Sequence, residues 1–312
     1  KGRTVLPTFI ELNSNIGIVT EKKESSRSYK PQIESNKGSS FYWNEAIHPE
    51  VDASVMYSKN KALIKDINQK GFGFFVSHSN EGIVRGTGLL VSANGDNLSS
   101  DILSPQIASY YSLNKGDSKQ SYPSSQMGSI ALLRQSFYDF QYYTKSDLNF
   151  TDLSMEAWKS QMHLPRFFQT ADKLEILRAS KIANEFNSSF IYLGSGNEYE
   201  AIDPLKKLNS KIVIPINFPD AYDVSDPYIS RLIPLSQLKH WELAPLNFKI
   251  LKENNIEVAI SSSGLKSADQ FWKNIRLIIH SGVNKIDVLK ALTETPANFI
   301  GQGENIGRLE KD

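Results

Sequence analysis

Residues 164–195 read LPRFFQTADKLEILRASKIANEFNSSFIYLGS, and three elements follow one another in this stretch. LPRFFQT and SFIYLGS are short apolar runs of the length typical of buried strands. The segment 172–186 between them repeats apolar residues three or four positions apart, at Ile176, Ala179, Ala183 and Phe186. That spacing puts them on one face of a helix. The order strand, helix, strand predicts a parallel βαβ unit.

The same alternation extends through most of the chain. Further strands are predicted at TVLPTFIELN (4–13), FGFFVSH (72–78), IVRGTGLLVSA (83–93), KIVIPINF (211–218) and IEVAISSS (256–263). Helices are predicted over 52–70 and 126–145, after Asn197 and before Asn255. This pattern suits an open doubly wound sheet or a closed barrel. A (β/α)₈ barrel takes about 250 residues, so the length of 312 residues favours the barrel.

Two segments interrupt the alternation, at 20–40 and 95–125. Both are rich in polar residues and show no hydrophobic period, so we predict loops there. The remaining pattern predicts a single domain over 1–312. The chain starts at Lys1 and ends at Asp312 without a natural boundary, so we expect it to be cut from a longer chain whose other part could carry a second, catalytic domain.

The bulk composition narrows the possible partners. Lys and Arg number 35 against 34 for Asp and Glu, which removes the electrostatic reason to expect nucleic acid or an acidic membrane surface. No run approaches the roughly 20 apolar residues of a membrane helix, so the chain is predicted to be soluble. The absence of cysteine excludes disulfides, thiolate zinc sites and a Cys nucleophile. It is compatible with either a cytoplasmic or an exported, periplasmic protein, so localisation stays open.

Two motifs at opposite ends of the chain carry a family resemblance. PTFIELNSN (7–15) resembles the first barrel strand of the amidohydrolase superfamily, and ALTETPANFIGQGENIGRLEKD (291–312) resembles its closing stretch. The order of segments between them is similar to imidazolonepropionase-like members. The resemblance implies an α/β fold, a TIM (β/α)₈ barrel of the metal-dependent hydrolase type in regular or distorted form. It also implies a flanking β-sandwich, whose strands would lie mostly outside this sequence.

The family chemistry depends on a metal centre that this sequence does not reproduce. Members usually hold one or two divalent ions such as zinc with two histidines of the first strand, histidines after two later strands and a final aspartate. The matching positions here are Asn13, Asn15, Gln169, Gly194 and Ser263. Neutral amides are poor ligands for zinc-like ions. We therefore expect no bound metal and no other cofactor.

Four polar residues are candidates for the mouth of the barrel, where active sites lie: His78 at the end of a predicted strand, Arg85 near the start of the next, and Glu198 and Asp220 after later strands. His78 could form a metal-free acid–base set with Glu198, Tyr199 and Asp220, and Arg85 could bind a carboxylate. The alternative, which we favour, is that His78 bonds to backbone and the others have structural roles. The glycines beside Arg85 indicate close backbone approach or unusual dihedral angles.

Other catalytic signatures are missing from the sequence. The five histidines lack H-x-H and H-E-x-x-H spacing, neither glycine-rich segment makes a dinucleotide fingerprint, and no G-x-S-x-G elbow occurs. We expect a catalytically degenerate amidohydrolase-like domain with a structural or small-molecule-binding role. The alternative is an active hydrolase of cyclic amides or dipeptide-like substrates that uses an atypical or metal-free site.

Overall fold

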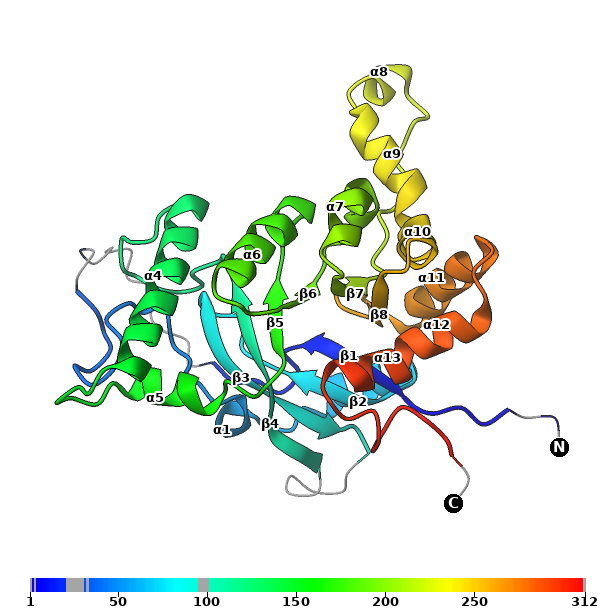
Figure 1. Cartoon of the computed structure of the whole chain (residues 1–312). Helices are drawn as coiled ribbons and strands as arrows, with labels where there is room; N and C mark the ends of the chain where they lie inside the picture. Colours follow the sequence, from blue (N-terminus) through cyan, green and yellow to red (C-terminus); the bar gives the residue numbers. More distant parts are fainter. Residues whose placement is uncertain (1, 3, 21–30, 32–33, 95–100, 311–312) are drawn as a thin grey trace.

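The computed structural model describes residues 2, 4–20, 31, 34–94 and 101–310 (Figure 1). Eight strands form one sheet in the order β1 to β8, which curves into a nearly closed barrel with helices on its outside. The strands are β1 (Phe9–Ser14), β2 (Phe72–Ser77), β3 (Val84–Ser92), β4 (Ile102–Ser112), β5 (Arg166–Gln169), β6 (Ile191–Leu193), β7 (Lys211–Pro215) and β8 (Glu257–Ser261). The predicted α/β barrel is confirmed.

Strand β3 departs from a regular barrel because it is antiparallel to both of its neighbours, β2 and β4. All other neighbouring pairs are parallel. The segment 78–83 between β2 and β3 is too short for a parallel crossover, which needs a dozen or more residues, so it forms a turn. As a result, β3 begins at the edge where the parallel strands end.

The prediction of a loop over 95–125 is wrong for part of its length, because β4 lies within it. The amino-terminal half of β4 is exposed or half-buried, and only the second half is buried. The exposed part pairs with β3, so backbone pairing rather than hydrophobic burial holds it as a strand. For the predicted loop 20–40, the described residues 20, 31 and 34–40 form no helix or strand, and the rest lies outside the described residues.

The helices surround the barrel, and the predicted helix over 52–70 is divided into α1 and α2 (Figure 1). Their bounds are α1 (Ala53–Met56), α2 (Lys61–Gln69), α4 (Gln126–Lys145), α5 (Leu153–Ser160), α6 (Lys173–Glu185), α7 (Ile202–Lys207), α8 (Pro227–Ser230), α9 (Leu235–Leu243), α10 (Asn247–Glu253), α11 (Ala268–His280), α12 (Lys285–Leu292) and α13 (Glu294–Phe299). Two 3₁₀ turns are present in the described residues: η1 (Glu198–Ala201) directly precedes α7, and η2 (Ala244–Leu246) joins α9 to α10. Figure 1 shows α8 and α9 projecting away from the barrel. Among the described residues, no helix combines the length and apolarity needed to cross a membrane.

The apolar core has two layers, because successive strand residues point to opposite faces of the sheet. On β1, Ile10 and Leu12 face the barrel interior, while Phe9 packs in the outer layer with the helices. The interior is filled by side chains from all eight strands and is joined by Phe299 and Ile300 near the end of α13. The barrel is therefore a packed core rather than a pore.

Glu11 joins the two ends of the sheet. Its carboxylate is 1% exposed and accepts hydrogen bonds from the Ser261 hydroxyl at 2.6 Å and from the Ser262 amide and hydroxyl at 2.6 and 2.8 Å. The amide of Asn13 donates to the same carboxylate at 3.0 Å. Burial raises the pKa of Glu11 and outweighs the lowering effect of these hydrogen bonds. A buried acidic side chain thus connects β1 to β8.

Candidate functional site

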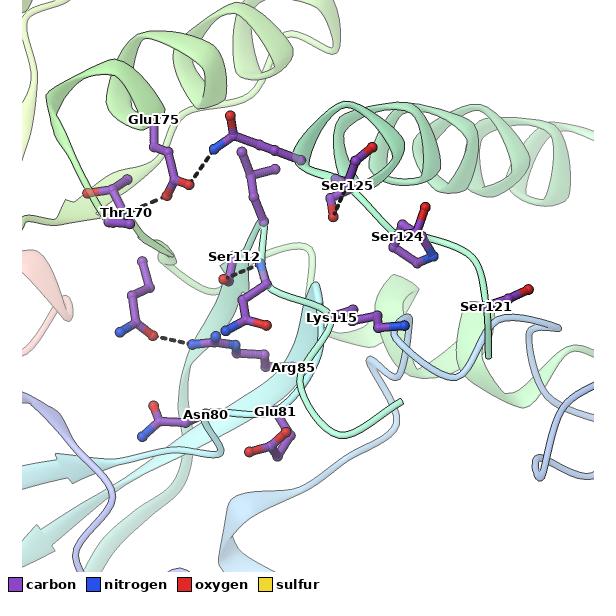
Figure 2. A pocket seen from close by; sticks show the side chains of 17 residues that line it. Asn80, Glu81, Arg85, Ser112, Lys115, Ser121, Ser124, Ser125, Thr170 and Glu175 are labelled. Atoms are coloured by element: carbon purple, nitrogen blue, oxygen red, sulfur yellow. Dashed lines mark hydrogen bonds between the residues drawn. The ribbon is translucent and has the colours of Figure 1, made fainter. Parts of the chain in front are cut away.

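A cavity of about 970 Å³ opens at the mouth of the barrel, where β4 and β5 end (Figure 2). Its walls come from the end of β4, the turn before β3, the segment before α4 and the segment before α6. The lining residues are Asn80, Glu81, Arg85, Ser112, Leu113, Asn114, Lys115, Ser121, Pro123, Ser124, Ser125, Gln126, Ser129, Gln169, Thr170, Ala171 and Glu175. Most of them are polar, so the cavity suits a polar ligand. We call it the mouth pocket.

Arg85 reaches the mouth pocket because β3 is antiparallel to its two neighbours, β2 and β4. As the second residue of a reversed strand, it lies beside the carboxyl ends of its neighbours. The next residue, Gly86, has a φ of +78°, and a side chain there would overlap the carbonyl oxygen of Val51. Both effects expected from the glycines beside Arg85 are therefore present, namely an unusual dihedral angle and close backbone approach.

The guanidinium of Arg85 is bound by neutral acceptors. Nε donates to the carbonyl of Gly82 at 2.9 Å. Nη1 donates to Oε1 of Gln169, the contact drawn as a dashed line at Arg85 in Figure 2. The side chain is 3% exposed, and burial lowers its pKa to about 10, so it remains charged at neutral pH. The charge of Glu81 raises this pKa, yet none of the ion pairs found among the described residues includes Arg85.

Two acids and one lysine also line the mouth pocket, and each is already bound. Glu81 accepts from the amide of Asp117 at 2.6 Å. Glu175 accepts from the amide of Ala171 at 2.7 Å and from the side chain of Gln126 at 2.6 Å. Lys115 donates to the carbonyl of Gln120 at 2.8 Å. These contacts hold the walls in place on both sides of Arg85.

His78 lies inside the barrel, fully buried, with its ring stacked on Tyr110 at 3.7 Å between centroids. Nδ1 lies 2.9 Å from the carbonyl of Ser79, which can only accept, so Nδ1 carries the proton. Nε2 then lacks a proton and lies 3.3 Å from Oδ1 of Asn13, which also can only accept, so a hydrogen bond between them requires the Asn13 amide to be turned with its NH₂ group toward the ring. Burial, together with the nearby charge of Arg85, lowers the pKa of His78 to about 3. Such a weak base is poorly matched to proton abstraction at neutral pH.

Glu198 is fully buried and binds its own loop. It accepts from the amide of Ser195 at 2.6 Å, from the amide of Gly196 at 3.0 Å and from the Asn247 side chain at 2.7 Å. A side chain at Gly194 would overlap Oε1 of Glu198. The position that the resemblance assigns to a metal-binding histidine is thus closed to any side chain while Glu198 keeps this place.

The remaining sequence-predicted positions lie apart from Arg85. Asp220 is exposed after β7, Asn15 is exposed beyond the end of β1, and the Ser263 amide donates to the Ser261 hydroxyl at 3.0 Å. Of His78, Arg85, Glu198 and Asp220, Arg85 alone is among the described residues that line the mouth pocket. The structure pairs Arg85 with Gln169, His78 with Asn13 and Glu198 with the loop at Gly194.

The residues at the family's ligand positions do not fit a zinc-like ion. They offer amide and hydroxyl groups, which bind such ions poorly, and the nearest charge to Gln169 is the cationic guanidinium that donates to it. Within the described part of the chain, no three His, Cys, Asp or Glu side chains are grouped as metal ligands. The donor set therefore argues against the metal that the resemblance implies.

Several residues of this region escaped the sequence reasoning. Ser112 and Lys115 lie in the segment 95–125, which was predicted to be a loop with no assigned role. Glu11 lies within the predicted strand 4–13 and was also assigned no role. Glu11 did leave a signal, since an acid in an apolar strand run requires a buried partner. Lys115 left none, because its place depends on the reversed strand β3.

Comparisons with known proteins support the fold. No family model and no curated protein sequence matches the chain. An amidohydrolase from Thermotoga maritima MSB8 is similar in structure, with a TM-score of 0.71 and 19% identity over 97% of this chain and 78% of that one. A prolidase gives a TM-score of 0.48 at 8% identity over 99% of this chain and 78% of its own, and a Xaa-Pro dipeptidase gives 0.40 at 12% over 97% and 77%. The likeness to the Thermotoga maritima amidohydrolase supports the barrel fold of this chain.

Proposed function

We propose that this amidohydrolase-type barrel lacks metal-dependent hydrolysis and serves as a small-molecule-binding domain. One observation carries the proposal. At Gln169, where the resemblance places a metal-binding histidine, the side chain accepts a hydrogen bond from the buried cation Arg85. A divalent ion at that point would meet a fixed positive charge in a medium of low dielectric constant, where repulsion between charges is strong.

The neighbouring positions support the same interpretation. The closed space at Gly194 removes a second ligand position, and the side chain of Asn13 lies 3.3 Å from the buried ring of His78. The mouth pocket nevertheless persists, with a volume in the range of small-molecule sites. A barrel can keep its binding mouth after losing its nucleophile, because the two depend on different side chains.

The test is elemental analysis of the purified protein, followed by hydrolysis assays on cyclic amides and dipeptides with and without added zinc or manganese. We expect far less than one ion per chain and no turnover above the buffer rate. One ion per chain, together with hydrolysis that a chelator abolishes, would overturn the proposal. Hydrolysis without metal would also overturn it, and the variant Asp220→Asn would then show whether the exposed acid takes part.

A further inference from the structure

No carboxylate forms an ion pair with Arg85 among the described residues, although the charge of Glu81 acts on it from nearby. Two of its three nitrogen groups donate to neutral oxygens, of Gly82 and Gln169. The hydrogen bonds among the described residues leave Nη2 without an acceptor. Taking a charge out of water costs several kcal/mol, and a group that accepts a hydrogen bond from Nη2 would offset part of that cost.

The mouth pocket lies against this cation. Arg85 belongs to its lining, as do Ser124, Ser125 and Gln126 at the start of α4. That helix has 20 residues, and the amino-terminal end of a helix carries a partial positive charge that favours anions. Figure 2 shows the guanidinium and the start of α4 on different sides of the same space. The surroundings of Arg85 thus favour a negatively charged group in the pocket.

The other charges of the mouth pocket limit what the anion can be. Glu81 and Glu175 line the pocket together with Lys115, so the four ionisable side chains, Arg85 included, sum to zero. The two carboxylates would repel a dianion strongly. A single negative charge placed at Arg85 is attracted by the guanidinium more than the more distant carboxylates repel it. The balance therefore favours a monoanion over phosphate.

We propose that the mouth pocket binds a small organic carboxylate whose anionic group accepts hydrogen bonds from Nη2 of Arg85. Hydrogen bonds between a guanidinium and a carboxylate are among the stronger ones in proteins. The neutral remainder of the ligand occupies the polar cavity between β4 and the start of α4. This inference rests on the proposed binding function and names the class of ligand for the same pocket.

The experiment is a calorimetric titration of the whole chain with three probes, N-acetylglycine, N-acetylglycinamide and inorganic phosphate, in buffer containing a chelator. The acid and its amide differ by the carboxylate, so we expect the amide to bind at least about tenfold more weakly. Phosphate is also expected to bind more weakly than the acid. Equal binding of acid and amide, or tighter binding of phosphate, would overturn the inference.

A pair of variants separates binding from folding. Arg85→Gln should abolish the preference for the acid, but removing a buried side chain can also unfold the barrel. Gln126→Glu adds a negative charge to the pocket from an exposed position at the first turn of α4, where acids suit the helix, and it replaces the hydrogen bond from Gln126 to Glu175 by repulsion between two carboxylates. We expect it to weaken binding of the acid several-fold more than binding of the amide, because only the acid carries a charge that the added carboxylate repels.

Met127→Glu is the matched control for that charge. It places the same carboxylate one residue further along α4, on a side chain that is 79% exposed and outside the pocket lining. The acid should bind this variant as it binds the unmodified protein. If Gln126→Glu and Met127→Glu behave alike, the carboxylate is not bound in the mouth pocket. Because the chelator is present throughout, a metal found by elemental analysis would count against the proposed function, whereas failure of these titrations counts against the carboxylate alone.

Discussion

His78 is a buried base whose neutral form is built into the barrel. Its pKa in the folded state, about 3, lies below the ordinary value of 6.5. As the pH falls, His78 is therefore protonated in the unfolded chain while it is still neutral in the folded state. Its contribution to stability is complete above pH 6.5 and is lost on acidification toward pH 3. Between pH 7 and 5 the protein should lose about 2 kcal/mol of unfolding free energy through this residue.

The variant His78→Phe keeps a ring against Tyr110 and removes the titration. Urea unfolding at pH 7 and pH 5 should show the loss of about 2 kcal/mol in the unmodified protein beyond whatever the variant loses. The comparison cancels the other titrating groups, which both proteins share. Equal losses in the two proteins would mean that His78 takes up a proton in the folded state.

The contribution of Glu11 to the free energy of unfolding has the opposite pH dependence. Its folded pKa is raised above the ordinary 4.5, so its favourable contribution is complete below pH 4.5 and is lost as the pH rises through the folded pKa. The unmodified protein should lose up to about 1.4 kcal/mol per pH unit in that window relative to Glu11→Gln. Urea unfolding at several pH values measures it, and Glu304→Gln, an exposed acid, is the control. A matching pH dependence in Glu11→Gln would contradict the raised pKa.

At the scale of elements, the loop after β6 depends on one missing side chain. Gly194→Ala would push the Glu198 carboxylate away from the amides of Ser195 and Gly196. We expect a loss of about 2–4 kcal/mol, because buried donors lose their acceptor and the site becomes overpacked. Thermal or urea unfolding measures it. Gly38→Ala is the control, since the nearest atom to its added carbon would be 3.8 Å away, and an equal effect of both variants would refute the role of Glu198.

Elements were predicted well where buried side chains give the sequence a hydrophobic pattern. They were predicted poorly where only backbone pairing holds the strand. Strands β5 to β8 are buried and apolar, and their runs at 166–169, 191–193, 211–215 and 257–261 lie within the predicted strands. Strand β4 was missed because Ser104 to Gln106, which are half-buried or exposed, show no hydrophobic alternation. The reversed direction of β3 was also not predicted, although the short segment 78–83 before it is a sequence signal for antiparallel pairing.

At the scale of the whole molecule, stability should not depend on metal ions. A resident metal stabilises a folded protein by its binding free energy, so a chelator would lower the unfolding temperature of a metalloenzyme. Here the proposed function predicts the same unfolding temperature with and without a chelator, measured by calorimetry on dialysed protein. A fall of several degrees that added zinc reverses would contradict it.

The sequence alone determined the barrel, because apolar runs at βα spacing and the two terminal motifs depend only on neighbours in the chain. It also identified Asn13 and Gln169 as poor ligand positions, since ligand chemistry belongs to the residue type. Tertiary structure alone decided which side chains meet. Glu11 joins Ser261 across 250 positions, and Arg85 joins Gln169 only because β3 is reversed. Contacts of this kind arise from strand order and direction, which hydrophobic periodicity does not record.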